Sequence, residues 1–163
     1  MKDAVSIRKA LESDREALGR YGGALMRQHH AFDPERFITV AKPESGYGQF
    51  LATQLDDANS LVLVAELEGR VVGYLFAGIE PMSWKDLRAP CGYIHDVLVE
   101  ESARGHGTGE RLVKAALAWC ASNGMPRTVL SSAARNEGAQ RFFARLGFRP
   151  TMVEMTREAT PVR

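Results

Sequence analysis

Three glycines alternate with other residues directly before a helical pattern, and this arrangement constrains the chain more than any other feature. They stand at Gly105, Gly107 and Gly109, and apolar residues at helical spacing follow at once. Glycine accepts a positive φ and lets a ligand approach the backbone closely. The free N–H groups and the dipole at a helix N-terminus favour an anion. The loop therefore predicts a phosphate cradle at the start of a helix over 107–121.

Two common phosphate-binding loops do not fit these residues. The loop G-x-x-x-x-G-K-[ST] needs a glycine five residues after Gly105, where Glu110 stands. The dinucleotide fingerprint G-x-G-x-x-G needs its third glycine at Glu110 or at Leu112, depending on where it starts. The phosphate must therefore belong to another kind of ligand.

The composition indicates one globular domain over residues 1–163. The 163 residues are 45% hydrophobic and 25% charged, and the net charge of +1 gives no global attraction to nucleic acid or a membrane. The charge is uneven, because residues 1–100 carry 11 basic against 15 acidic side chains while residues 101–150 carry 8 against 3. Two cysteines and the lack of an apolar leader predict a reduced, cytoplasmic protein.

Strand and helix patterns alternate along the chain. Strands are expected at 5–10, 60–67, 71–80, 91–100, 127–133 and 151–158. Helices are expected over 12–29, 107–121 and 137–147, with the pair Gly22-Gly23 breaking or bending the first. The segments 29–38 and 42–57 are expected to hold turns and one short helix between them. Meandering strands followed by alternating strands and helices predict a mixed α+β fold.

The glycine loop and a second motif resemble those of the GNAT N-acetyltransferase family. Arg104, Gly107 and Gly109 fit its motif [QR]-x-x-G-x-[GA]. The segment "NEGAQRFFARLGF" fits N-x-x-A-x-x-Φ-[YF]-x-x-x-G-F, and "YIHDVLVEESARGHGTG" is similar to the family's fourth strand running into its pyrophosphate loop. The resemblance covers residues 5–10 and about 60–150.

The resemblance implies a GNAT fold, an α+β architecture whose mostly antiparallel central sheet is splayed between strands 4 and 5 and flanked by helices. It also implies acetyl-CoA as co-substrate and a primary amine as acceptor, which attacks the thioester directly in a ternary complex. No metal, nucleic acid or membrane partner is expected, and a homodimer is left open.

The resemblance assigns two groups of residues to acetyl-CoA. Strand residues pair with the pantetheine arm and polarise the thioester, whereas the loop and the second motif hold the phosphates and the arm. The residues are Val97, Leu98, Val99, Arg104, Gly105, His106, Gly107, Thr108, Gly109, Glu110, Asn136, Phe142 and Phe143. The remaining phosphate is expected at Arg104, Arg135, Arg141 or Arg145.

His95 is the candidate catalytic base, because it stands where polyamine acetyltransferases of the family have a glutamate. Imidazole titrates near neutrality, which suits this role, although a hydrogen-bonded cleft histidine is the alternative. Strict alternation along the strand sends Asp96 to the opposite face from His95.

One departure from the family pattern affects the leaving group. Phe143 replaces a tyrosine that protonates the thiolate in many relatives, and a phenyl ring has no proton to give. Tyr21, Tyr47 and Tyr93 are possible substitutes. The departure supports one alternative function, an acyl-CoA-binding module with little or no catalysis. Another nucleotide-binding domain is a third reading, which the motif from Asn136 to Phe148 argues against.

Overall fold

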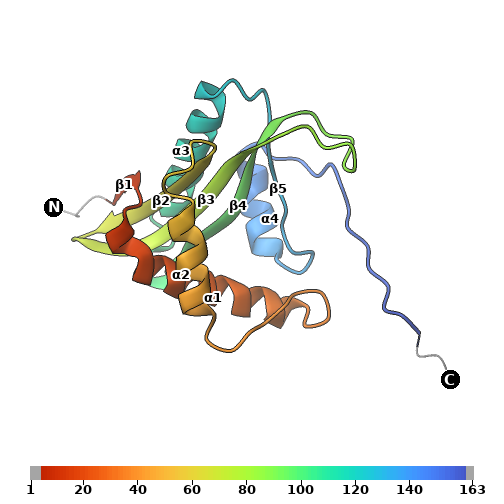
Figure 1. The fold of residues 1–163 in the computed structure, drawn as a ribbon, viewed down its shortest axis with the longest axis horizontal. Coiled ribbons are helices and arrows are strands. Elements are labelled where there is room, and N and C mark those ends of the chain that lie inside the picture. Colours follow the sequence, from red (N-terminus) through yellow and green to blue (C-terminus); the bar gives the residue numbers. More distant parts are fainter. Residues whose placement is uncertain (1–4, 161–163) are drawn as a thin grey trace.

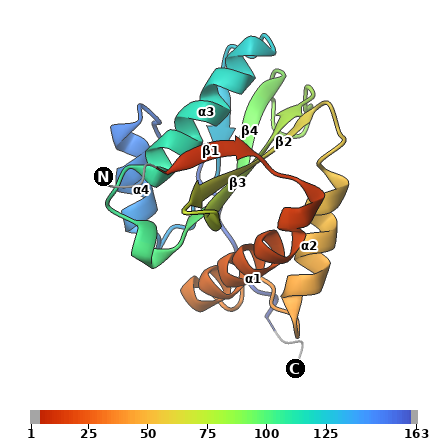
Figure 2. The same cartoon turned by 90° about the vertical axis from the view of Figure 1, so that its left-hand side faces the viewer.

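A five-stranded sheet forms the centre of the molecule, with helices on both faces, as the computed structural model of residues 5–160 shows (Figures 1 and 2). The strands are β1 (Ser6–Lys9), β2 (Ser60–Leu67), β3 (Arg70–Glu80), β4 (Cys91–Val99) and β5 (Thr128–Leu130). They lie side by side in chain order. The first three pairings are antiparallel and β4 pairs with β5 in parallel, as the mostly antiparallel GNAT sheet requires.

The helices form one layer on each face of the sheet. α1 (Arg15–Phe32) and α2 (Pro43–Thr53) cover one face, and α3 (Thr108–Ser122) and α4 (Glu137–Arg145) cover the other (Figure 2). Two short 3₁₀ turns, η1 (Glu12–Asp14) and η2 (Glu101–Ala103), precede α1 and the glycine loop.

Alternation along the strands supplies both cores. On β3, Leu75 faces the core beneath α3, while its neighbours Tyr74 and Phe76 face the core beneath α1 and α2. The α3 core includes the fully buried Leu112 and Ala116, which lie one turn apart on the helix. Each helix thus buries one apolar stripe against the sheet, which fixes where its N-terminus points.

Glycines hold α1 and α2 in close contact rather than interrupting the helix. The predicted break at Gly22-Gly23 is wrong, because α1 runs unbroken from Arg15 to Phe32. A Cβ on Gly22 would lie 2.0 Å from the ring of Tyr47, and one on Gly48 would lie 2.8 Å from the Arg15 carbonyl oxygen. Absent side chains therefore let the two backbones approach, and this contact outweighs the poor helix propensity of glycine.

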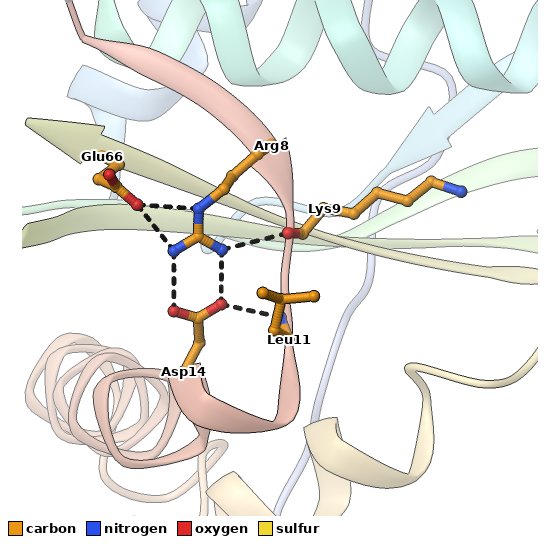
Figure 3. Close-up of polar contacts among 5 residues, drawn as sticks. All are labelled: Arg8, Lys9, Leu11, Asp14 and Glu66. Carbon is orange, nitrogen blue, oxygen red and sulfur yellow. Dashed lines mark hydrogen bonds and ion pairs between the residues drawn. The ribbon is translucent and has the colours of Figure 1, made fainter. Parts of the chain in front are cut away.

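An arginine ties the start of α1 to the edge of the sheet (Figure 3). The Arg8 guanidinium on β1 binds the Asp14 carboxylate through two hydrogen bonds of 2.7 and 3.0 Å, and its Nε donates to Glu66 on β2 at 2.8 Å. The same carboxylate accepts the Leu11 backbone N–H at 2.8 Å. Arg8, the largest influence, holds the pKa of the buried Asp14 carboxyl below its usual range. The cluster therefore fixes the turn that feeds α1 across the sheet.

Two expected strands differ in the structure. β5 has three residues rather than the seven expected over 127–133. No strand forms over 151–158, where the chain is extended and exposed. A strand needs a hydrogen-bonded neighbour as well as a suitable sequence, and within residues 5–160 this segment has none.

Candidate functional site

A β-bulge in β4 turns two polar side chains toward the same side of the sheet. Phe76 on β3 pairs with Asp96, and Ala77 pairs with Ile94, so that His95 is an extra residue on β4. Side chains normally alternate between the two faces of a sheet, and an inserted residue lets two successive side chains lie on the same face. The His95 ring stacks on Phe76, and Asp96 bonds to Tyr74, both on the α1–α2 side. The expectation that Asp96 lies on the opposite face from His95 is therefore wrong.

His95 is held by a carboxylate and two aromatic rings. Its Nε2 lies 3.0 Å from Oε1 of Glu80, at the end of β3. Its ring stacks between Phe76 and Tyr93, with both centroid distances at 4.8 Å. The side chain is 32% exposed, so it reaches solvent or a ligand while its orientation is fixed.

Asp96 lies deeper and accepts two tyrosine hydroxyls. Tyr47 Oη from α2 donates to Oδ2 at 2.6 Å, and the fully buried Tyr74 donates to the same oxygen at 3.0 Å. Burial raises the pKa of the Asp96 carboxyl, and the two hydroxyl donors act against that rise. The site thus contains one partly buried carboxylate, Asp96, that lacks a cationic partner within the described hydrogen bonds and ion pairs.

The sheet opens between β4 and β5 immediately beside these residues. Pairing ends at Ile94 and Leu130, while β4 continues to Val99. A cavity of about 890 Å³ occupies the splay and runs from the glycine loop to α1. The predicted site residues that line it are His95, Val97, Leu98, Val99, Arg104, Gly105, Gly107, Thr108, Gly109, Glu110, Asn136, Phe142 and Phe143.

The glycine loop has the backbone expected of an anion cradle. Gly105 and Gly107 have φ of 75° and 76°, and Gly107 is the N-cap residue of α3. Thr108 Oγ1 donates to the Ala103 carbonyl at 3.1 Å and pins the loop from its buried side. Positive φ turns successive N–H groups toward one side, next to the positive end of the α3 dipole. The loop is thus suited to a phosphate.

His106 occupies the same loop but is not among the cavity-lining residues. Its ring is exposed, and Nδ1 lies 2.9 Å from the Arg104 carbonyl oxygen. Only its backbone N–H is therefore a candidate for ligand contact, and the predicted role of His106 stays a prediction.

Two polar side chains, Ser132 and Asn136, lie between β5 and α4 on the side of the cavity opposite β4. Ser132 Oγ is buried and has no hydrogen-bond partner within residues 5–160. Asn136 caps α4 by accepting the Ala139 N–H at 3.2 Å. Ser132 thus carries an unsatisfied hydroxyl beneath the wall of the cavity, whereas the side-chain oxygen of Asn136 already has one partner.

The four candidate arginines divide by position. Arg104 and Arg145 line the cavity, and Arg104 Nε donates to the Val99 carbonyl at 2.9 Å. Arg135 instead donates to the Phe32 carbonyl at 2.8 Å, and Arg141 pairs with Glu137 at 3.5 Å. Arg104 and Arg145 are therefore better placed than the other two to meet phosphate.

The three tyrosines named as possible substitutes for the missing acid differ in position and in hydrogen bonding. Phe143 is buried against Phe148 with a centroid distance of 5.7 Å. Burial, followed by Glu100, raises the pKa of Tyr21 to about 12, and Tyr21 is not among the cavity-lining residues. Burial also raises the pKa of Tyr47, which already donates to Asp96. Tyr93 Oη lies 2.6 Å from Ser131 Oγ, and of these two only Ser131 lines the cavity.

The end of the cavity opposite the glycine loop is formed mostly by side chains that no sequence motif identified. Its wall comes from α1, the 33–42 connection and α2, where the resemblance is weakest. The lining residues here are Leu25, Met26, Gln28, His29, Phe37, Ile38 and Tyr47. The sequence motifs also did not identify Glu80 as the hydrogen-bond partner of His95. The only available signal was that β3 and β4 are neighbouring antiparallel strands, which brings the end of β3 close to the middle of β4.

Residues 5–160 contain neither a membrane-spanning helix nor a cluster of metal-binding side chains. No helix there is long and apolar enough to cross a membrane. That part of the chain also holds no group of three or more histidine, cysteine or acidic side chains arranged to bind a metal ion.

Comparison with known proteins identifies the family to which this chain belongs. The sequence model of the Acetyltransferase (GNAT) family matches residues 24–148. The chain belongs to this family. An uncharacterized N-acetyltransferase of Bacillus subtilis (strain 168), YhfO, is 27% identical over 146 residues, which cover 88% of this chain and 89% of that protein.

Solved structures share the GNAT fold. A mutant of the BH1408 protein from Bacillus halodurans has a TM-score of 0.84 at 22% identity, covering 95% of this chain and 99% of that one. The aminoglycoside N-acetyltransferase AAC(6')-Iy, solved in complex with CoA, has a TM-score of 0.76 at 17% identity, covering 98% and 97%. The predicted GNAT fold is confirmed.

Proposed function

We propose that this GNAT protein transfers the acetyl group of acetyl-CoA to a primary amine by direct attack in a ternary complex. One observation carries the proposal. A single cavity of about 890 Å³ connects the glycine loop at the start of α3 with His95 and Asp96 on β4. A phosphate-bearing donor at one end and an amine at the other would then meet in the splay. Proximity of this kind supplies much of the rate of a two-substrate reaction.

The donor end is suited to coenzyme A. The loop from Arg104 to Glu110 offers backbone N–H groups to the pyrophosphate, and Arg104 and Arg145 offer charge to the remaining phosphate. The pantetheine arm would lie along Val97, Leu98 and Val99, where β4 has no β5 neighbour. A β4 N–H there would polarise the thioester carbonyl.

His95 is the proposed general base at the acceptor end. An amine is protonated at neutral pH, with a pKa of about 10 for an alkylamine, and must lose a proton to attack. A proton on Nε2, donated to Glu80, leaves Nδ1 as the acceptor. His95 takes the first proton from the ammonium and passes it to solvent. The neutral amine nitrogen then bonds to the carbonyl carbon, the nitrogen loses its second proton to solvent through His95, and the C–S bond breaks with its electron pair on sulfur as the carbonyl re-forms.

The thiolate would leave without a tyrosine acid. A thiol has a pKa of ~8.5, so a free thiolate is accessible near neutral pH. The pKa of Tyr47 is raised above the ordinary tyrosine value of ~10 by burial and Asp96, which makes Tyr47 a poor donor to a thiolate.

The acceptor end favours an amine carried on an apolar body. Asp96 is the one carboxylate lining this end among residues 5–160, and Leu25, Met26, Phe37 and Ile38 supply apolar wall. A partly buried carboxylate such as Asp96 attracts a single ammonium, because the local dielectric there is lower than in water. A polycation would need several carboxylates, so a small apolar monoamine or a protein lysine fits better.

A matched pair of glycine variants tests the donor site. Gly107→Val should abolish acetyl-CoA binding by calorimetric titration, since Cβ would fill the space above the cradle. Gly69→Val is the control, because Gly69 has nearly the same positive φ of 74°, has no atom within 4 Å of an added Cβ and lies in the β2–β3 turn. Both variants carry similar backbone strain, so equal affinities would refute the site.

Turnover separates the enzyme from the alternative, an acyl-CoA-binding module with little catalysis. The buried Phe143 is the observation that favours the module. Release of free thiol from acetyl-CoA should depend on added amine and should be greater with apolar monoamines and lysine peptides than with polyamines. Tight acetyl-CoA binding without amine-dependent release would establish the module instead.

A further inference from the structure

His29 is a cavity-lining side chain of α1 that the proposed reaction does not use. It lies in the last turn of the helix and shares the acceptor end of the cavity with Phe37 and Ile38. Its ring packs edge-on against Phe32 and Phe37, with centroid distances of 6.1 and 5.0 Å. These contacts fix the orientation of a half-buried imidazole at the wall of the cavity.

One ring nitrogen of His29 is committed to the helix backbone. Nδ1 lies 2.9 Å from the carbonyl oxygen of Leu25, one turn earlier on α1. A carbonyl oxygen can only accept, so the proton of the neutral ring is on Nδ1 and Nε2 keeps its lone pair. Nε2 is on the far side of the ring from that contact, and it accepts no hydrogen bond within residues 5–160. The neutral ring therefore offers an acceptor to a ligand.

Asp96 has a second acceptor atom at the same end of the cavity. Both tyrosine hydroxyls donate to Oδ2, whereas Oδ1 accepts no hydrogen bond in the described part of the chain. Burial raises the pKa of the Asp96 carboxyl, and the rings of His95 and His29 are among the influences that oppose the rise. Electrostatic influence falls with distance, so the carboxylate and both imidazoles lie near one another.

Three acceptors in one place match the three N–H bonds of a primary ammonium. They are Nε2 of His29, Oδ1 of Asp96 and Nδ1 of His95, all on residues that line the cavity. An N-methylated ammonium has only two N–H bonds and leaves one acceptor without a partner. A site built to accept a hydrogen bond discriminates against a ligand that lacks the donor, because the buried acceptor then stays unpaired.

We propose that His29 is a specificity-determining residue, whose Nε2 accepts one N–H of the acceptor ammonium while Asp96 and His95 accept the other two. The inference rests on the proposed function for the identity of the ligand as an amine. His95 remains the base, and His29 adds no chemical step. Its effect is to select primary amines over N-methylated ones.

Calorimetric titration of the coenzyme A complex tests this role apart from turnover, because no acetyl group is present. Phenethylamine and N-methylphenethylamine are compared at about pH 8, where a free imidazole is neutral. A hydrogen bond to a charged group is worth roughly tenfold or more in affinity, so the wild type should bind phenethylamine at least about tenfold more tightly. His29→Phe keeps an aromatic ring but has no nitrogen, and its preference should fall to about twofold or less.

Two control variants separate hydrogen bonding from shape. His29→Gln places an amide oxygen near the position of Nε2 and should keep most of the preference. His30→Phe changes the next residue, whose Nδ1 also lies 2.9 Å from a carbonyl oxygen, that of Phe37, but which is not among the cavity-lining residues. It should keep the wild-type preference. Far-UV circular dichroism and an unchanged affinity for coenzyme A check that each variant is folded.

The outcomes distinguish this role from the proposed function. A preference that survives His29→Phe, or a wild-type complex that binds neither amine or both equally, would overturn the role of His29 even if amine-dependent release of thiol is observed. The predicted pattern of preferences without any release of thiol from acetyl-CoA would instead refute acetyl transfer and support His29 as a ligand to the amine.

Discussion

Gly22→Ala should destabilise the protein and disturb the candidate site together. An added Cβ would lie 2.0 Å from Cδ1 and 2.4 Å from Cγ of Tyr47, so the ring must shift by about 1.4 Å to reach ordinary contact. Overpacking of this kind costs about 1–3 kcal/mol. The shift also breaks the 2.6 Å hydrogen bond to Asp96, worth about 1.5–3 kcal/mol for a charged acceptor. Alanine has a higher helix propensity than glycine, and this difference offsets about 1 kcal/mol of the cost. The expected net loss in unfolding free energy is about 1.5–5 kcal/mol.

Urea denaturation with two controls isolates this effect. Gly46→Ala changes a glycine on α2 that has no atom within 4 Å of an added Cβ, and should stabilise the protein by about 0.5–1 kcal/mol. In a Tyr47→Ala background the clash is gone, so Gly22→Ala should become neutral or stabilising. A Gly22→Ala variant as stable as the wild type, or one with the same cost in both backgrounds, would refute the packing explanation.

Three further predictions concern the site and the sheet edge. His95→Gln should lower kcat by at least about tenfold and leave acetyl-CoA affinity nearly unchanged, because loss of a general base costs about 10²–10⁴-fold in rate. Unchanged turnover in steady-state kinetics would remove His95 from the mechanism. Arg104→Ala should weaken coenzyme A more than a pantetheine fragment without phosphates, and calorimetry showing equal losses would make Arg104 structural. The lowered pKa of Asp14 means that its pairing with Arg8 stabilises the fold above the unfolded value of ~3.9 and is lost as the pH falls below it. Asp14→Asn should therefore lower the unfolding free energy by about 1–2 kcal/mol at pH 7, allowing for the 34% exposure of the Arg8 side chain. In urea denaturation at several pH values, the variant should also lose less stability on acidification than the wild type. An unchanged pH dependence would argue against the ion pair.

The sequence determined features that depend on neighbours in the chain. The β2–β3 turn required positive φ at Glu68 and Gly69, and the glycine loop required it at Gly105 and Gly107. Helices α3 and α4 follow from apolar periodicity and from stop signals such as Gly124 and Gly147. These features are local, because each is set by a few consecutive dihedral angles and side chains. The GNAT fold was predictable for that reason, since its two motifs are short and ordered.

The tertiary structure decided what depends on contacts between distant segments. The bulge at His95 arises from the register between β3 and β4, and it brings His95 and Asp96 to one face, against the alternation read from the sequence. The pair Gly22-Gly23 reads as a helix break until α2 supplies the Tyr47 ring that occupies the space. Residues 151–158 have strand propensity but no neighbour within the described chain. Propensity belongs to a residue, whereas register, close approach and strand pairing belong to pairs of segments, and only the fold brings those pairs together.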